Sequence, residues 1–249
     1  MNTLDTAYSY GNSYDVLGEI GISDYCVISK LPPVPDECDD VNQWLDQIMK
    51  QSLSRLKIDR LHGLLLHKPQ QLLGKFGDNL YKGLQALKST GRVVKIGISI
   101  YDPIELDSIC DRFEMDIVQA PLNVVDRRIL ASGWCSQLLQ RGIELHVRSI
   151  FLQGLLLMSV SQRPEKFNRW SSLWSEWDQW LKDNNLTALQ ACLRYAMSFR
   201  EIDKIVVGVD SLKQLDEIIR ASRGSLPELP ANLHCSDIDL VNPARWSSL

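Results

Sequence analysis

Four side chains that can exchange protons or form strong hydrogen bonds lie at or near the ends of three short apolar runs. Asp5 ends the first run, and Tyr10 follows it by five residues. Lys30 ends the second run, and His67 ends the third. In a parallel α/β barrel the chemistry is carried at the ends of the strands. We therefore expect these four side chains to meet at one end of such a barrel.

The chemistry that suits this set is the delivery of a proton to an oxygen that gains negative charge. A free tyrosine has a pKa of about 10 and is a poor donor at neutral pH. A lysine beside it, itself held by a carboxylate, favours the phenolate and lowers that pKa. Asp5, Lys30 and Tyr10 can form such a chain, and His67 can orient a carbonyl oxygen. The set therefore suits carbonyl reduction, provided that a hydride donor binds nearby.

Each of these residues also has a simpler interpretation when it is taken alone. Asp5 could end a solvated strand, and Lys30, which precedes Leu-Pro-Pro, could open a loop. His67, which precedes Lys-Pro, could be a hydrogen-bonded histidine at a barrel rim. Singly, these structural interpretations are favoured. They lose ground when the residues are considered as one ordered set.

The apolar runs that would position these side chains recur along the whole chain. Each is short and rich in Val, Ile or Leu, as strands buried on both faces are. Seven such runs lie near residues 3–7, 26–29, 61–66, 94–98, 116–119, 144–147 and 204–207. Helical patterns fill most intervals, with Asp40 and Asp78 as predicted N-caps of two helices. This alternation predicts a parallel sheet that closes into a barrel, with residues 1–249 as one domain.

The composition narrows the class of protein. The chain has 249 residues, near the ~250 of a single α/β barrel. A net charge of −4 gives no reason to expect a nucleic acid or an anionic membrane as partner. No apolar stretch approaches the ~20 residues that a membrane helix needs. The six cysteines are scattered without a Cys-x-x-Cys pair, which favours reduced thiols in the cytoplasm over disulfides or a metal site.

Several segments resemble the aldo-keto reductase family. The Asp-x4-Tyr spacing matches the family pattern and selects Tyr10 over Tyr8 as the reactive tyrosine. Two longer signatures agree with it. They are Ser52-Leu-Ser-Arg-Leu56 leading into Leu64-Leu-Leu-His67-Lys-Pro69, and Gly83-Leu-Gln-Ala-Leu-Lys88 leading into Gly91-Arg-Val-Val-Lys-Ile-Gly97-Ile-Ser99. The resemblance covers essentially the whole chain and implies a TIM-type (β/α)8 parallel barrel.

The resemblance also implies an activity. It implies an NAD(P)H-dependent oxidoreductase that reduces an aldehyde, a ketone or a sugar carbonyl to an alcohol, or catalyses the reverse. Tyr10 would be the proton donor, and Asp5, Lys30 and His67 would support it. The partner would be a small carbonyl compound. The sequence does not identify this compound, because the loops that select a substrate are the variable ones.

The nicotinamide site follows the family pattern only in part. Ser99 and Gln119 match residues that hold the nicotinamide amide, but Ile100 stands where the family usually has Asn. Arg148, followed by Ser149, stands where an aromatic ring often stacks on the nicotinamide. A guanidinium plane can stack on a ring as well. The resemblance therefore implies a nicotinamide site with one amide hydrogen bond fewer.

The phosphate end of the cofactor would lie after the last strand. Gly208, Ser211 and Gln214 lie just before and within the first turn of a helix whose N-terminus can receive a phosphate. Some relatives have Lys and Arg where Gly208 and Gln214 stand, and those residues grip the 2′-phosphate of NADP. NADP stays favoured over NAD, by a reduced margin. Gly208 serves a tight strand-to-helix turn equally well.

The N-terminal end departs from the family pattern. Seven strands are predicted rather than eight. The C-terminal segment Asn242-Pro-Ala-Arg-Trp246, in contrast, resembles the end of family members. The first β/α unit and the N-terminal hairpin would then precede Met1, which is either an internal codon or a true truncation point. An open barrel exposes two sheet edges, so we expect self-association through them and weakened activity. The competing prediction is a non-catalytic or truncated aldo-keto reductase-like protein that binds or regulates.

Four tryptophans fall on one face of a predicted helix. They are Trp170, Trp174, Trp177 and Trp180. Four indoles could line a substrate pocket near the barrel mouth. The alternative, a helix packed on the outside of the barrel, is favoured.

Overall fold

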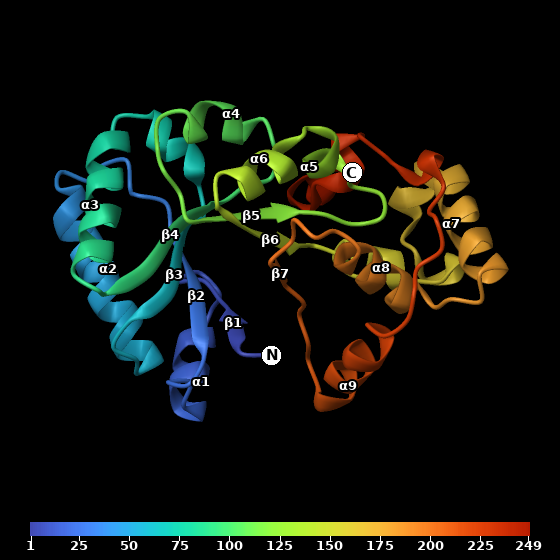
Figure 1. The fold of residues 1–249 in the computed structure, drawn as a ribbon, viewed down its shortest axis with the longest axis horizontal. Coiled ribbons are helices and arrows are strands. Elements are labelled where there is room, and N and C mark those ends of the chain that lie inside the picture. Colours follow the sequence, from blue (N-terminus) through green and yellow to red (C-terminus); the bar gives the residue numbers. More distant parts are fainter. The chain divides into compact units, whose positions relative to one another are not determined.

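The computed structural model describes all residues, Met1–Leu249. Figure 1 shows the helices and strands of the chain. The chain divides into two compact units. The first unit contains Met1–Gln119 and Gln140–Glu144, and the second contains Ala120–Leu139 and Leu145–Leu249. That residues 1–249 form a single domain stays a prediction.

Seven strands follow in the chain order β1 to β7. They are β1 (Thr3–Asp5), β2 (Cys26–Leu31), β3 (Leu61–Leu66), β4 (Val93–Ser99), β5 (Ile117–Pro121), β6 (Glu144–Arg148) and β7 (Lys204–Ile205). In the first unit β1 to β5 pair in parallel with their neighbours, and in the second β6 pairs in parallel with β7. All seven predicted strands are therefore confirmed, although β7 is short.

Helices fill the intervals between the strands, as the sequence predicts. The α-helices are α1 (Ser13–Ile20), α2 (Val41–Leu56), α3 (Gly77–Ser89), α4 (Glu105–Cys110), α5 (Arg128–Ala131), α6 (Trp134–Gln140), α7 (Ser171–Asp183), α8 (Ala188–Met197), α9 (Leu212–Ala221) and α10 (Ile238–Val241). The 3₁₀ helices are η1 (Pro69–Leu73), η2 (Leu155–Leu157), η3 (Val160–Gln162), η4 (Glu165–Trp170), η5 (Ala231–Leu233) and η6 (Pro243–Ser248).

The strand register of the first unit brings the carboxyl ends of β1, β2 and β3 to one edge. Asp5 pairs with Ile28 across β1 and β2, two residues before Lys30. Beyond the strands, the backbone N–H of Tyr8 donates to the carbonyl of Lys30 at 3.1 Å. The segments that carry Asp5, Lys30 and Tyr10 are therefore held side by side by backbone hydrogen bonds.

The interior of the first unit depends on close approach of its strands. Ile28, Leu65 and Ile117 form a buried cluster. At Gly97 on β4, an added Cβ would lie 2.1 Å from the backbone oxygen of Ile117 on β5. At Gly63 it would lie 2.6 Å from a methyl group of Ile28. Both glycines are therefore places where the packing leaves no room for a side chain.

One of the two predicted helix caps is confirmed and the other is wrong. The Asp40 carboxylate accepts hydrogen bonds from the N–H groups of Asn42 and Gln43 at 2.9 and 3.0 Å and caps α2. Helix α3 instead begins at Gly77, so Asp78 lies in its first turn. A Cβ at Gly77 would lie 1.8 Å from the carbonyl oxygen of Leu72. The glycine lets the helix start directly after η1, and the Asp78 charge still suits the helix N-terminus.

Helix α7 in the second unit is packed by its tryptophans. Trp174, Trp177 and Trp180 are all at least nine-tenths buried. Their indole N–H groups donate to the carbonyl oxygens of Phe167, Leu156 and Glu228 respectively. Buried indoles whose N–H groups are used within the fold are packing elements. The prediction of a packed helix is therefore favoured over a tryptophan-lined pocket.

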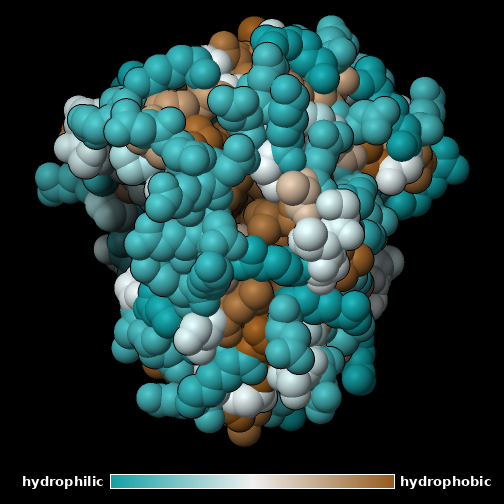
Figure 2. All heavy atoms as spheres, turned by 90° about the vertical axis from the view of Figure 1, so that its left-hand side faces the viewer, coloured by the Kyte–Doolittle hydropathy of each residue, from teal (hydrophilic) through white to brown (hydrophobic).

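The surface over α2 and α3 is mainly hydrophilic. Figure 2 faces the side of the molecule on which these helices lie in Figure 1, and hydrophobic atoms show there only in narrow strips. Each helix has one buried apolar face, which includes Leu45 and Met49 in α2 and Leu80 and Leu84 in α3. None of the helices combines the length and the apolar character needed to cross a membrane.

Candidate active site

A buried ion pair forms the centre of the candidate site. The Lys30 ammonium donates to Asp5 Oδ1 at 2.5 Å, and the two side chains are 1% and 14% exposed. It also donates to the backbone carbonyl of Thr6 at 3.1 Å. A buried ammonium needs such partners to stay charged. Lys30 is therefore a fixed positive charge at the end of β2.

Tyr10 and His67 lie next to this charge. Lys30 Nζ is 5.3 Å from the centre of the Tyr10 ring. The Tyr10 and His67 rings meet edge to face, with centroids 6.1 Å apart. Tyr10 is about half exposed and His67 is partly buried, so both rings can reach a bound molecule. The structure thus brings the four predicted residues together.

The neighbouring tyrosines are engaged elsewhere. The Tyr8 hydroxyl donates to Gln51 Oε1 on α2 at 2.7 Å. Tyr14 is buried and its hydroxyl is hydrogen-bonded to Ser29. Burial raises the pKa of Tyr14, which makes its hydroxyl a weaker acid. Of the three tyrosines in this segment, Tyr10 is the one beside Lys30 and His67.

Gln119 at β5 belongs to the same cluster of side chains. Its amide Nε2 donates to Asp5 Oδ2 at 2.7 Å, and the residue is 1% exposed. Ser99, at the end of β4, lies 3.4 Å from the Gln119 carbonyl oxygen through its hydroxyl. Ile100 beside it is fully buried and apolar. The pair predicted to hold a nicotinamide amide therefore lies in the same unit as the four acid–base residues.

The contact between Gln119 and Asp5 was not predicted from the sequence. The two residues are 114 positions apart. The sequence indicates Gln119 as a nicotinamide-binding residue at the end of an apolar run, and nothing in it points to Asp5 as a partner. Thr6 was missed for a simpler reason, because its backbone carbonyl, which any residue would supply, is the group that accepts from Lys30.

In the second unit, Arg148 is the last residue of β6 and Ser149 follows it. Arg148 Nη1 donates to the Ser149 hydroxyl at 3.2 Å. Ser149 has a φ of +60°, and Leu152 and Gln153 also have positive φ values. Non-glycine residues in this region cost energy and gather at functional segments. The backbone conformation makes this segment a candidate for ligand contact.

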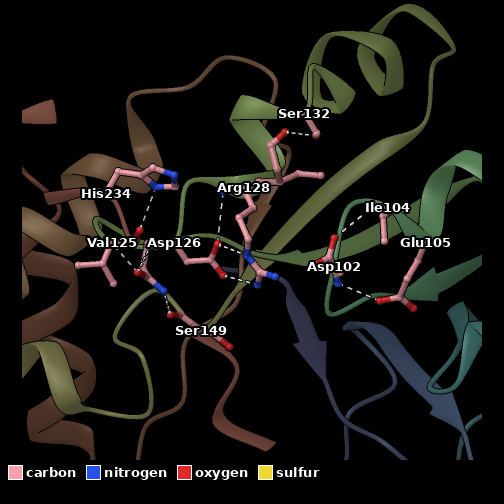
Figure 3. A network of polar contacts seen from close by, with 11 residues as sticks. Asp102, Ile104, Glu105, Val125, Asp126, Arg128, Ser132, Ser149 and His234 are labelled. Atoms are coloured by element: carbon pink, nitrogen blue, oxygen red, sulfur yellow. Dashed lines mark hydrogen bonds and ion pairs between the residues drawn. The ribbon is translucent and has the colours of Figure 1, made fainter. Parts of the chain in front are cut away.

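The turn after β5 supports that segment. The Asn123 side chain donates to the carbonyl oxygen of Ser149 at 3.1 Å and accepts from the N–H of Asp126 at 2.8 Å. The buried Asp126 carboxylate holds the Arg128 guanidinium through two hydrogen bonds of 2.8 and 2.9 Å (Figure 3). Sequence reasoning missed this network, because Asn, Asp and Arg in a turn are common and carry no signal of their own.

The other three predicted cofactor residues lie before and within α9. Ser211 caps the helix by accepting from the Gln214 N–H at 3.2 Å. The Gln214 side chain in turn accepts from the N–H of Asp210 at 2.7 Å. A Cβ added at Gly208 would have no heavy atom within 4 Å. This leaves an open, hydrogen-bonded turn before the N-terminus of a ten-residue helix, a setting that suits a phosphate.

Groups within each unit suit a different part of a nicotinamide dinucleotide. A carboxamide needs one donor and one acceptor, which the amide of Gln119 and the hydroxyl of Ser99 can supply. A phosphate needs N–H groups and positive charge, which α9 supplies through its first turn and Lys213. A hollow of about 380 Å³ on α9 is lined by Leu212, Lys213, Asp216, Glu217 and Arg220.

Solved structures that match this fold include aldo-keto reductases. The apo and holo forms of aldo-keto reductase AKR11C1 from Bacillus halodurans both have a TM-score of 0.68, at 19% and 20% identity. The matches cover 94% and 93% of this chain and 79% of that chain. A candidate 2,5-diketo-D-gluconic acid reductase B has a TM-score of 0.69 at 18% identity, covering 98% of this chain and 82% of its own.

The family model gives the same answer from the sequence. No curated protein sequence matches the chain. The model described as "Aldo/keto reductase family" matches residues 1–230, which is most of the chain. With the parallel strands, the fold of the solved relatives and this match, the chain belongs to the aldo-keto reductase family.

Proposed function

We propose that the chain is an NAD(P)H-dependent oxidoreductase that reduces an aldehyde, a ketone or a sugar carbonyl to an alcohol, or catalyses the reverse. Tyr10 is the proton donor. The observation that carries the proposal is the buried pair of Lys30 and Asp5, whose ammonium lies 5.3 Å from the centre of the Tyr10 ring. Membership of a family of oxidoreductases supports it.

Each of the four residues has a different role in the protonation of the carbonyl oxygen. When bound, the nicotinamide cofactor supplies the hydride. Tyr10 gives its hydroxyl proton to the carbonyl oxygen and is left as a phenolate. The positive charge of Lys30 stabilises that phenolate, because it is buried and close. Asp5 holds Lys30 in place, and His67 hydrogen-bonds the carbonyl oxygen and orients it. A proton from solvent then restores Tyr10, which is partly exposed.

The replacement Tyr10→Phe tests this role directly. It removes only the hydroxyl, so the fold and cofactor binding should survive. Carbonyl reduction should fall by ~10²-fold or more, because the proton donor is gone. The measurement is NAD(P)H-dependent turnover on a panel of aldehydes, ketones and sugar carbonyls, including a 2,5-diketo sugar acid, which the name of one structural relative suggests.

Tyr8→Phe is the matched control for this experiment. Tyr8 is two residues away and its hydroxyl bonds to Gln51 rather than facing Lys30. Its loss should leave turnover within a few-fold of the wild type. Near wild-type turnover in Tyr10→Phe would show that Tyr10 is not the donor.

We also propose that the cofactor is NADP(H) rather than NAD(H), by a modest margin. Gly208 and Gln214 give no positive charge to a 2′-phosphate, but Lys213 and Arg220 lie on the same helix. Calorimetric titration of the apo-protein should give a lower Kd for NADPH than for NADH, with a ratio of roughly tenfold, about 1.4 kcal/mol. Lys213→Met should reduce that ratio. Tighter binding of NADH would refute the preference.

A second candidate function is a non-catalytic aldo-keto reductase-like protein that binds or regulates. The observation that favours it is the short β7, which pairs through two residues only. Binding of NADPH without turnover on any carbonyl would support this alternative.

We propose the cytoplasm as the location, since all six cysteines are free thiols and a reducing compartment keeps them so.

A further inference from the structure

The Asp5 carboxylate is held from two sides by different groups. Lys30 donates to Oδ1 at 2.5 Å, and Gln119 donates to Oδ2 at 2.7 Å. Both donors are 1% exposed. A carboxylate with one donor on each oxygen cannot rotate without losing a hydrogen bond. Asp5 is therefore fixed in orientation by Gln119 as well as by Lys30.

The direction of the Gln119 amide is set by its neighbours. A carboxylate only accepts hydrogen bonds, so the amide N–H₂ must face Asp5. The amide oxygen then faces Ser99, whose hydroxyl lies 3.4 Å away and can donate to it. Ser99 therefore donates to Gln119, and Gln119 donates to Asp5. The hydrogen bonds all point in one direction, towards the ion pair.

This arrangement has an electrostatic consequence for Lys30. A hydrogen bond from a neutral amide stabilises part of the negative charge of Asp5. Asp5 then offsets less of the positive charge of Lys30. More of the charge of Lys30, which is itself buried, is left to act on the half-exposed Tyr10.

We propose that Gln119 is a positioning residue that tunes the acidity of Tyr10 through Asp5 and Lys30. The proposal rests on the proposed function and deepens it. Gln119 acts through the carboxylate and does not touch the reacting atoms in this role. The amide has two N–H groups, so its contact with Asp5 uses one of them. Tuning of Tyr10 is therefore separate from any contact of Gln119 with a cofactor.

The charged and titratable groups around Tyr10 come from several elements. Lys30 lies at the end of β2, with Asp5 behind it, and His67 follows β3. From α2, the Arg55 guanidinium donates to the carbonyl oxygen of Gly11 at 3.4 Å and is paired with Asp15. Gln119 is uncharged, so changing it to another neutral residue alters the field at Tyr10 only through Asp5.

The test is a pH titration of Tyr10 in the apo-protein. The phenolate absorbs at longer wavelength than the phenol, so the difference between a protein and its Tyr10→Phe version isolates Tyr10. Gln119→Met keeps the length of the side chain and removes the N–H donor. It should raise the Tyr10 pKa by roughly half a unit. Gln119→Glu places a second carboxylate beside Asp5 and should raise it further.

Gln71→Met is the matched control for the loss of a partly buried amide in the same unit. The Gln71 side chain bonds to the backbone N–H and carbonyl of Val34 at 2.9 and 2.8 Å. It has no contact with Asp5, so its loss should leave the Tyr10 titration unchanged. Circular dichroism of all variants checks that they fold. The pH profile of kcat/KM for carbonyl reduction should shift with the titration in both Gln119 variants.

The outcomes separate this proposal from the proposed function. A raised Tyr10 pKa in both Gln119 variants supports positioning, even if the wild type reduces no carbonyl tested. Weaker NADPH binding with an unchanged Tyr10 titration would overturn positioning while leaving the reductase function intact. An equal shift in Gln71→Met would also overturn it, because the effect would then be general.

Discussion

At the residue scale, Gly97 is a position where β4 and β5 pack so closely that there is room for a hydrogen atom but not for a side chain. Gly97→Ala would place a methyl group 2.1 Å from the Ile117 backbone oxygen, which cannot move aside as a flexible side chain can. We expect a loss of about 3 kcal/mol in the free energy of unfolding. Urea denaturation followed by circular dichroism measures this loss.

Gly74→Ala is the control for Gly97→Ala. A Cβ at Gly74 has its nearest atom at 3.7 Å, an ordinary contact, and its φ is −99°. This variant should unfold within about 0.5 kcal/mol of the wild type. Equal urea midpoints for the two variants would show that β4 can move away from β5 at no cost.

The sequence is a good guide to single residues when their position follows from strand order. Asp5, Lys30 and His67 lie at or just after the ends of successive parallel strands, so their meeting at one edge follows from the alternation of strands and helices. The contact of Gln119 with Asp5 did not follow, because it depends on the curvature of the sheet and on a rotamer. The choice of Tyr10 over Tyr8 rested on family spacing, and the bond from Tyr8 to Gln51 gives it a physical reason.

At the element scale, one buried cation ties the η3–η4 segment to α7. The Arg163 side chain is 4% exposed. Its guanidinium bonds to both oxygens of Asp178 at 2.6 and 2.8 Å and stacks on Trp174 at 5.0 Å. Asp178→Ala would leave a buried charge without its partner. Because Asp178 is 30% exposed, water can replace part of the loss, and we expect a cost of ~2 kcal/mol in urea denaturation.

A surface ion pair provides the control for Asp178→Ala. Asp15 pairs with Arg55 at 2.8 Å, and its side chain is 52% exposed. Asp15→Ala should leave the urea midpoint nearly unchanged, because water screens such pairs. If Asp178→Ala were equally silent, Arg163 would have to reach solvent or another acceptor in the variant. Arg163→Met combined with Asp178→Ala should recover part of the loss, since it removes the buried charge.

The sequence predicted element types more reliably than element starts. The seven strands and the Asp40 cap of α2 are confirmed, because apolar runs and short polar caps are local signals. The Asp78 cap of α3 is wrong, because the helix start is fixed by the close approach of Gly77 to Leu72, a contact that no local signal announces. The tryptophans of α7 were correctly favoured as packing residues.

At the scale of the whole molecule, the second unit exposes apolar side chains after β7. Val209 is 42% exposed, Leu212 is 75% exposed and Ile219 is 39% exposed. Self-association through open sheet edges stays a prediction. We propose that this surface also takes part, and sedimentation velocity should show mass rising with concentration. Leu212→Glu combined with Ile219→Glu should reduce it. Ile104→Glu, at an apolar residue 70% exposed in the first unit, is the control and should leave it unchanged. A monomer at all concentrations would contradict the proposal.

The distribution of tryptophan gives the molecule an uneven optical signal. Of the seven tryptophans, only Trp44 lies in the first unit, and the other six lie in the second. The four acid–base residues all lie in the first unit. Intrinsic fluorescence therefore reports almost entirely on the part of the chain that does not hold them. A loss of structure around Tyr10 would pass nearly unseen in an emission spectrum, unless Trp44 were the only indole left in the chain.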